Sequence, residues 1–296
     1  MSEKTVTAPV TTAPAGEDDF PIKPRRNLID WIGFPVVGFL VILFIYNLFT
    51  NPNWRWDVVG EYLFHPLVLQ GVLTTIVLTL VSGVTGTIFG LILAGMRLSR
   101  SPLLRGIATA FIGFMRAIPA LVLLLLIYFT SAVFPEVGFG IPFTDIMFYE
   151  IPVNAIITQF VAAWLGLTLI MGSHTGEIFR GGVISVPGGQ VEAAKALGMS
   201  PSLTFFKVVM PQMIRVSIPA LANELISLFK NTSLVSIIGY AELLTVVQSI
   251  YGRTYQTIPL LIVACIWYLV IVIISMLGQQ RLEKRFGRGF GVGANA

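Results

Sequence analysis

The chain has 296 residues, of which 55% are hydrophobic and only 11% are charged, and its net charge is +4. Ordinary soluble domains carry roughly 25% charged residues, so this composition excludes a soluble protein and predicts an integral membrane protein. The single cysteine, Cys265, and the two widely separated histidines, His65 and His174, argue against a disulfide framework, a zinc site or histidine-based catalysis.

The first segment, residues 1–27, is rich in Thr, Ala and Pro and contains an acidic cluster. No apolar core directly follows a basic start, so we do not expect a signal peptide here. The composition instead predicts a disordered cytoplasmic tail. A recruiting motif within this tail is the alternative.

Six apolar segments are long enough to cross a hydrocarbon core of ~30 Å, which takes about 20 helical residues. These runs exceed the length of barrel strands and lack alternation with a period of two, so we expect helices throughout. The sequence therefore predicts an all-α integral membrane protein with six transmembrane helices. The segments are Trp31–Phe49, Gly71–Met96, Ile107–Val133, Ile156–Gly172, Ser217–Ile238 and Pro259–Gly278.

The Lys and Arg residues predict the orientation of these spans. Six spans place both termini on one side of the membrane. The N-terminal tail, the 97–106 loop, the 178–216 segment and the C-terminal tail hold 15 of the 19 Lys and Arg residues. The opposite side holds only Arg55 and Arg253. Because basic residues concentrate on the cytoplasmic side, both termini are predicted to be cytoplasmic.

The second span carries a small residue at every fourth position. A stripe of this kind lets another helix approach closely. We favour packing against a helix of the same chain, and a contact with another subunit is the alternative. The residues are Ser82, Gly86, Gly90 and Ala94.

The cytoplasmic segment between the fourth and fifth spans is too long for a tight connection. Its "VPGGQ" interrupts the chain, and a short helix is predicted to begin near Val191. Glu192 would then lie near the positive end of this helix and Lys195 near its negative end. Gly198 is placed to end the helix in a left-handed conformation.

A second short helix is predicted to follow. Ser200 is expected to cap it, Pro201 to occupy its first position and Pro211 to close it. The first helix offers one Lys and several alanines, whereas a helix on lipid headgroups usually needs several basic and large apolar residues. Docking of another protein is therefore favoured over a position on the membrane surface.

The fifth span is the least apolar of the six. At 100° per residue, its polar side chains fit within an arc of about 120°, and the opposite side is apolar. Charged residues in a membrane helix face the protein interior or water, so the arc either lines a substrate path or pairs with neighbouring helices. On a path, Lys230 would meet a substrate carboxylate and Glu224 an ammonium group. The polar residues are Asn223, Glu224, Ser227, Lys230 and Asn231.

Charges near two other spans are less informative. We assign no binding role to Arg116 in "GFMRAIPAL". Glu177 and Arg180 are three residues apart in "GEIFRGG" and can pair on one helix face. Such a pair would act as a structural clamp at the base of the cytoplasmic segment, or alternatively as a gate.

The cytoplasmic segment resembles the "EAA" loop in permease subunits of ABC-type importers. That pattern is EAA, a Gly after three further residues, nine residues and then I-x-L-P. The chain has Glu192-Ala193-Ala194, Gly198 at the family spacing, and Val208, Met210 and Pro211 at the corresponding places, with Val for Ile and Met for Leu. The flanking "GEIFRGGVISVPGGQ" and "LISLFKNTSLVSIIGYAELL" resemble the polar amino-acid branch, and the resemblance covers roughly residues 66–284.

The resemblance implies a five-helix type I importer core at 66–284, with a coupling loop at 187–212. The helix at 28–50 is then an addition to the core, and 285–296 is a cytoplasmic tail. The coupling loop would dock in a cleft of a separate ATPase through Glu192, Ala193, Ala194, Gly198, Pro201 and Pro211.

The resemblance also implies partners. These are two ATPase subunits, a second permease subunit that is the same or homologous, and an external substrate-binding protein, assembled in the bacterial inner membrane. The chain has no G-x-x-x-x-G-K-[ST] phosphate loop, so it is not expected to be an enzyme. ATP and Mg would be used by the partner ATPase, and this chain would bind no cofactor.

Two other function classes compete with an importer subunit. A secondary transporter or channel would move a small polar solute alone, but such folds tend to show inverted repeats and broken mid-membrane helices. We find no convincing internal repeat in the sequence. A scaffold or assembly factor would leave the polar arc of the fifth span unexplained.

Overall fold

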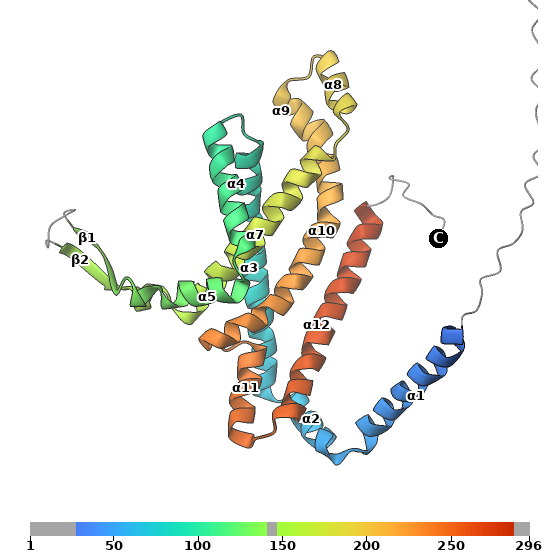
Figure 1. Cartoon of the computed structure of the whole chain (residues 1–296). Helices are drawn as coiled ribbons and strands as arrows, with labels where there is room; N and C mark the ends of the chain where they lie inside the picture. The colour runs from blue at the N-terminus through green and yellow to red at the C-terminus, as the bar shows by residue number, and fades with distance from the viewer. Residues whose placement is uncertain (1–27, 141–146, 287–296) are drawn as a thin grey trace, which may run out of the picture. The chain divides into compact units, whose positions relative to one another are not determined.

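The computed structural model describes residues 28–140 and 147–286 (Figure 1). The chain forms two compact units, one ending at Trp54 and the other beginning at Arg55. The tail predicted over 1–27 and most of the tail predicted over 285–296 lie outside the described residues. The first unit contains helix α1 (Leu28–Thr50) and a 3₁₀ turn (Pro52–Trp54).

The second unit consists mostly of helices, and proline sets the start of several of them. Pro66, Pro102 and Pro201 each open a helix behind a capping side chain, because proline fixes a helical φ and needs no hydrogen-bond acceptor there. In chain order the elements are α2 (Trp56–Leu63), α3 (Pro66–Leu98), α4 (Pro102–Ala117), α5 (Ala120–Tyr128), a 3₁₀ turn (Phe129–Ala132), β1 (Glu136–Gly140), β2 (Met147–Pro152), α6 (Val153–Ile156), α7 (Gln159–Ile184), α8 (Gly188–Ala196), α9 (Pro201–Thr204), a π-helical turn (Phe205–Val209), α10 (Met210–Asn231), a 3₁₀ helix (Thr232–Ile238), α11 (Leu243–Thr254) and α12 (Thr257–Phe286).

Helix α7 packs against α3, α4, α5 and α10. The small residues of α3 allow α7 to approach it closely. A Cβ atom on Gly86 would lie 2.6 Å from the Met171 side chain, and one on Gly90 would meet Thr175. Ser82 and Ala94 are buried as well. The prediction that this stripe packs within the chain is therefore confirmed.

Two buried clusters extend the core beyond this contact. One joins α3 to α11 and α12, and it includes Val68, Leu243 and Leu260. The other joins α3 to α5, α7 and α10, and it includes Leu124 and Leu167. The clusters thus pack α7 and the apolar side of α10 against other helices of the same chain.

Four helical runs among the described residues are long and apolar enough to cross a membrane, or five if one bent pair counts as a span. Helix α7 is long enough but less apolar than the others. It can tolerate Gly, Ser, Thr and charged residues because other helices of the chain cover much of it. The runs are Gly33–Thr50, Pro66–Leu98, Pro201–Ile238 and Thr257–Arg285, with Pro102–Ala117 and Ala120–Ala132 as the bent pair.

The predicted third span, Ile107–Val133, is not one straight helix. Helices α4 and α5 meet at an angle of 102°. Ile118 has an extended conformation, which is the conformation that a following proline favours, and Pro119 then precedes α5. A proline between two apolar runs therefore ends α4 and redirects the chain.

The prediction that all the structure is helical is wrong for residues 136–140 and 147–152. Strands β1 and β2 form an antiparallel hairpin that pairs Glu136 with Pro152 and Val137 with Ile151. Proline and glycine disfavour a helix here, whereas the β-branched and aromatic residues of β2 suit a strand. The fold is therefore mostly helical with one two-stranded hairpin between α5 and α7 (Figure 1).

Candidate functional site

The first helix of the predicted coupling loop is α8, and it begins at Gly188, three residues before the predicted start. Glu192 therefore lies in the middle of α8, so the prediction that it lies at the positive end is wrong. Lys195 lies in the last turn, as predicted. The helix starts earlier because Pro187 precedes it in an extended conformation, after which two glycines can follow the helical path.

Gly198 ends α8 as the sequence predicts. Its φ is +76°, in the left-handed region that glycine tolerates best. The Gly198 N–H donates to the carbonyl of Lys195 over 2.9 Å, and the Met199 N–H donates to that of Ala194 over 3.1 Å. This pair of hydrogen bonds is a Schellman motif. It sets the direction in which the chain leaves α8.

The start of the second helix is confirmed, but its predicted end is wrong. The Ser200 hydroxyl accepts a hydrogen bond from the Leu203 N–H over 3.3 Å, and Pro201 is the first residue of α9. Pro211 does not close this helix, because the chain continues helically from Pro201 to Ile238. A proline ring normally conflicts with the carbonyl four residues earlier. The π-helical turn before Pro211 widens the backbone there and accommodates the ring.

Most of the predicted coupling residues are exposed. Only Ala194 is buried, with 3% of its surface accessible, so it packs against its own chain. Leu197, which sequence analysis does not single out, is 82% exposed at the end of α8. An exposed apolar side chain at the end of a helix can act as an anchor residue that inserts into a pocket of a docking partner. The exposed residues are Glu192, Ala193, Gly198, Pro201 and Pro211.

A side-chain contact connects α8 to α10. The Gln212 amide donates to the Gln190 carbonyl oxygen over 2.6 Å and to the Val208 backbone carbonyl over 2.8 Å. Because the two glutamines are 22 residues apart, their pairing is not visible in the sequence. The contact holds α8 against the start of the long helix that follows it.

Below this loop, Glu177 of α7 takes part in two ion pairs. The predicted pair with Arg180 is confirmed, with 2.9 Å between Arg180 Nη2 and a carboxylate oxygen. Arg97 at the end of α3 forms the second pair, which the sequence does not reveal. The carboxylate therefore ties α3 to α7 at the end of both helices that lies nearest the loop.

Glu177→Gln is expected to lower the stability of the protein. The substitution leaves two partly buried arginines without their carboxylate, at a cost of about 1–3 kcal/mol. Thermal unfolding of the purified protein measures the effect, with Glu61→Gln on the exposed surface of α2 as the control. A clamp predicts a lower melting temperature. Unchanged stability with altered transport would contradict the clamp and indicate the gate.

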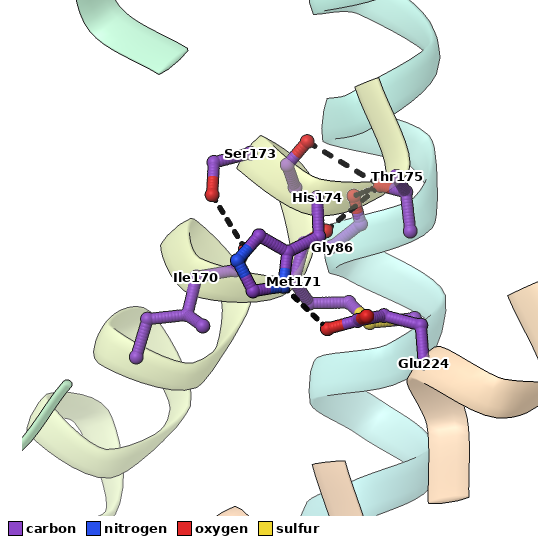
Figure 2. A network of polar contacts seen from close by, with 8 residues as sticks. Gly86, Ile170, Met171, Ser173, His174, Thr175 and Glu224 are labelled. Atoms are coloured by element: carbon purple, nitrogen blue, oxygen red, sulfur yellow. Dashed lines mark hydrogen bonds and ion pairs between the residues drawn. The ribbon is translucent and has the colours of Figure 1, made fainter. Parts of the chain in front are cut away.

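A second polar site lies between α7 and α10 (Figure 2). His174 Nδ1 lies 2.6 Å from Glu224 Oε1, and both side chains are partly buried, with 36% and 20% of their surfaces exposed. Figure 2 shows the imidazole ring of His174 directed at the Glu224 carboxylate. Next to this pair, Thr175 donates to the carbonyl of Gly86 over 3.2 Å. Sequence analysis identifies Glu224 but not its partner.

The other residues of the predicted polar arc have different surroundings. Asn223 is exposed and accepts a hydrogen bond from Gln279 of α12 over 3.0 Å. Lys230 is exposed and forms no salt bridge within residues 28–140 and 147–286. Ser227 and Asn231 are half-buried.

The opposite side of α10 is apolar, as predicted. Leu228 and Phe229 are buried. Nearer the coupling loop, an apolar groove of about 450 Å³ separates α10 from α3. Leu221, Ala222 and Leu225 line its α10 side. The polar arc therefore lies on the face of α10 turned away from this groove.

No group of three or more His, Cys, Asp or Glu side chains in the described part of the chain could hold a metal ion. The features that remain are a helical membrane core, an exposed loop joined to two long helices, and a polar site between those helices. This combination defines an integral membrane subunit of a transport system. The chain belongs to the family of binding-protein-dependent transport system inner membrane components, which it matches over residues 86–288.

Two relatives cover most of the chain. An arginine transport system permease protein of Corynebacterium glutamicum is 37% identical over 275 residues, which are 90% of this chain and 83% of the relative. An L-cystine transport system permease protein of Bacillus subtilis is 35% identical and covers 79% of this chain and 92% of its own length.

Solved structures share the fold. A crystal structure of an amino acid ABC transporter with histidines has a TM-score of 0.66 and 31% identity, and covers 77% of this chain and 98% of its own. The methionine ABC transporter MetNI, in an inward-facing conformation, has the same fold with a TM-score of 0.59 and 21% identity, and covers 75% and 97%.

Proposed function

We propose that this chain is the permease subunit of an ATP-driven importer that moves a polar amino acid across the bacterial inner membrane by alternating access. The observation that carries the proposal is the exposed loop at 187–212, whose first helix ends in a Schellman motif. Relatives named for arginine and L-cystine transport support an amino acid as substrate.

The loop supports coupling to a separate ATPase. Its first helix and the two residues that follow it present little bulk at Ala193 and Gly198 and one large apolar side chain at Leu197, all exposed. Lys195 is its only basic residue, which does not favour a position on anionic headgroups. We propose that Glu192, Ala193, Ala194, Gly198, Pro201 and Pro211 form the coupling surface, with Ala194 packed inward to support the helix.

The proposed assembly follows from membership of this family. It contains two ATPase subunits that use ATP and Mg, two permease subunits, and an external binding protein. We propose six membrane spans with both termini in the cytoplasm: the five-helix core at 66–284 and the additional helix at 28–50. In this arrangement α7 is a membrane span that is largely buried by other helices of the same chain.

The polar arc of α10 is the proposed substrate path. Exposure of Asn223 and Lys230 in a helix of this length supports contact with water or substrate rather than lipid. The pairing of Glu224 with His174 supports the alternative of structural pairing for that one residue. Glu224, Ser227 and Asn231 complete the proposed path.

The test is ATPase activity and amino acid uptake in proteoliposomes that contain this chain, its ATPase and its binding protein. Stimulation by one amino acid, abolished by Glu192→Ala and retained by Ser202→Ala at an exposed position that the EAA pattern leaves unspecified, is the expected result. Uptake by the chain without any ATPase would contradict the importer and indicate a secondary transporter or channel.

A further inference from the structure

The separation of the two charged residues of the proposed path along α10 limits which substrates can contact both. Glu224 and Lys230 are six residues apart, which corresponds to a rise of about 9 Å along the helix and a rotation of about 120°. Both belong to one uninterrupted helix, so the backbone holds this separation constant. The site therefore presents a carboxylate and an ammonium group at different depths.

The two charges differ in their partners. The Glu224 carboxylate has a cation-capable partner, His174, at 2.6 Å. Lys230 is exposed and has no carboxylate partner within the described ranges 28–140 and 147–286. A buried or half-buried ion is stabilised most by a partner of opposite charge, because their attraction is strongest in a site of low dielectric. Lys230 is thus available to an anionic group, and Glu224 to a cation that replaces the imidazole.

The spacing discriminates among amino acids. In a neutral amino acid the ammonium and the carboxylate are bonded to the same carbon, so one molecule cannot place them at two positions so far apart. An amino acid with a cationic side chain carries a second positive charge at the far end of a flexible stem. Such a molecule can place its carboxylate at Lys230 and its side-chain cation at Glu224.

We propose that Glu224 and Lys230 select a cationic amino acid, and that the side-chain cation of the substrate replaces His174 on the Glu224 carboxylate. This inference rests on the proposed function and names the substrate class of the proposed path. His174 is a positioning residue: it keeps the carboxylate paired, and held toward α7, until substrate arrives. Because α7 and α10 carry the two ends of the coupling loop, the exchange loosens a contact between the helices that flank the loop (Figure 1).

The experiment measures binding of arginine and of citrulline to the complex of this chain and its ATPase in nanodiscs, without the external binding protein. Citrulline is a neutral analogue of nearly the same shape. The wild-type complex is expected to bind arginine at least about tenfold more tightly, since a charge-assisted hydrogen bond contributes enough for that ratio. Glu224→Gln is expected to remove the preference, and Glu61→Gln on α2 is the matched control that retains it.

His174→Leu tests the exchange. It removes the competing imidazole, so the Kd for arginine is expected to fall while that for citrulline stays the same. A rise in both Kd values would overturn the positioning role. Monodisperse elution of each variant with its ATPase shows that it is folded.

Equal binding of arginine and citrulline by the wild type, or a preference that survives Glu224→Gln, would overturn the inference. ATP-dependent uptake by the same preparation with its binding protein separates this failure from failure of the proposed function. Uptake without charge preference overturns only the inference. Absence of ATP-dependent uptake of any amino acid overturns the proposed function.

Discussion

Gly90→Leu is expected to destabilise the second unit strongly. A Cβ atom at Gly90 would meet the Thr175 side chain and lie 2.8 Å from the backbone nitrogen of Gly176. The backbone cannot move aside as a flexible side chain can. Overpacking of a core typically costs 1–3 kcal/mol, and a clash with backbone in the α3–α7 contact is expected to exceed about 3 kcal/mol. Native proteins are stable by only about 5–15 kcal/mol.

The measurement is the yield of monodisperse protein and its melting temperature after extraction from the membrane. Gly95→Leu is the matched control, because Gly95 lies on the same helix, is exposed and has no atom within 4 Å of an added Cβ. Equal yield and stability for the two variants would show that α3 and α7 do not pack as described.

Gly198→Val is expected to uncouple the permease from its ATPase while leaving the membrane core folded. A β-branched residue is strongly disfavoured at a φ of +76°, although the space around Gly198 is open. The substitution acts through the backbone: it breaks the Schellman hydrogen bonds and redirects the chain between α8 and α9. A loss of about 1.4 kcal/mol of docking energy already weakens binding tenfold. We therefore expect ATP-driven uptake to fall about tenfold or more.

Copurification of the ATPase and uptake in proteoliposomes measure this effect together. Gly189→Val provides the comparison, since Gly189 is also exposed and open but lies within α8 at an ordinary helical φ. If both variants retained the ATPase equally, the end of α8 would not direct the docking surface.

How well each feature could be predicted from the sequence depended on how far apart in the chain the residues that determine it lie. Gly198 and Ser200 act on backbone groups within a few residues, so their roles could be predicted from local chemistry. Pro211 is also local, but the π-helical turn that accommodates it has no recognisable signal in the sequence. Strands β1 and β2 could not be predicted from long apolar runs, because each strand is only a few residues long.

The partners of the site residues could not be predicted. His174 and Glu224 are 50 residues apart, and Arg97 meets Glu177 from another helix. A single sequence shows which residues are charged and on which helical face they lie. It does not show which faces meet, because that depends on the packing of α3, α7 and α10 as a whole. The polar arc was therefore predictable, whereas the imidazole that contacts it was not.

The continuous helix from Pro201 to Ile238 has a mechanical consequence. It begins at the exposed loop and contains the polar arc some 23 residues later, about 35 Å away along its axis. No loop interrupts this length, although Pro219 removes one backbone hydrogen bond within it. A tilt imposed at one end is therefore expected to move the other end as well. The π-helical turn at Phe205–Val209 lies close to the loop end, where it can absorb twist. A force applied in the cytoplasm would then displace Glu224 through the motion of this one helix, rather than through a series of contacts between separate elements.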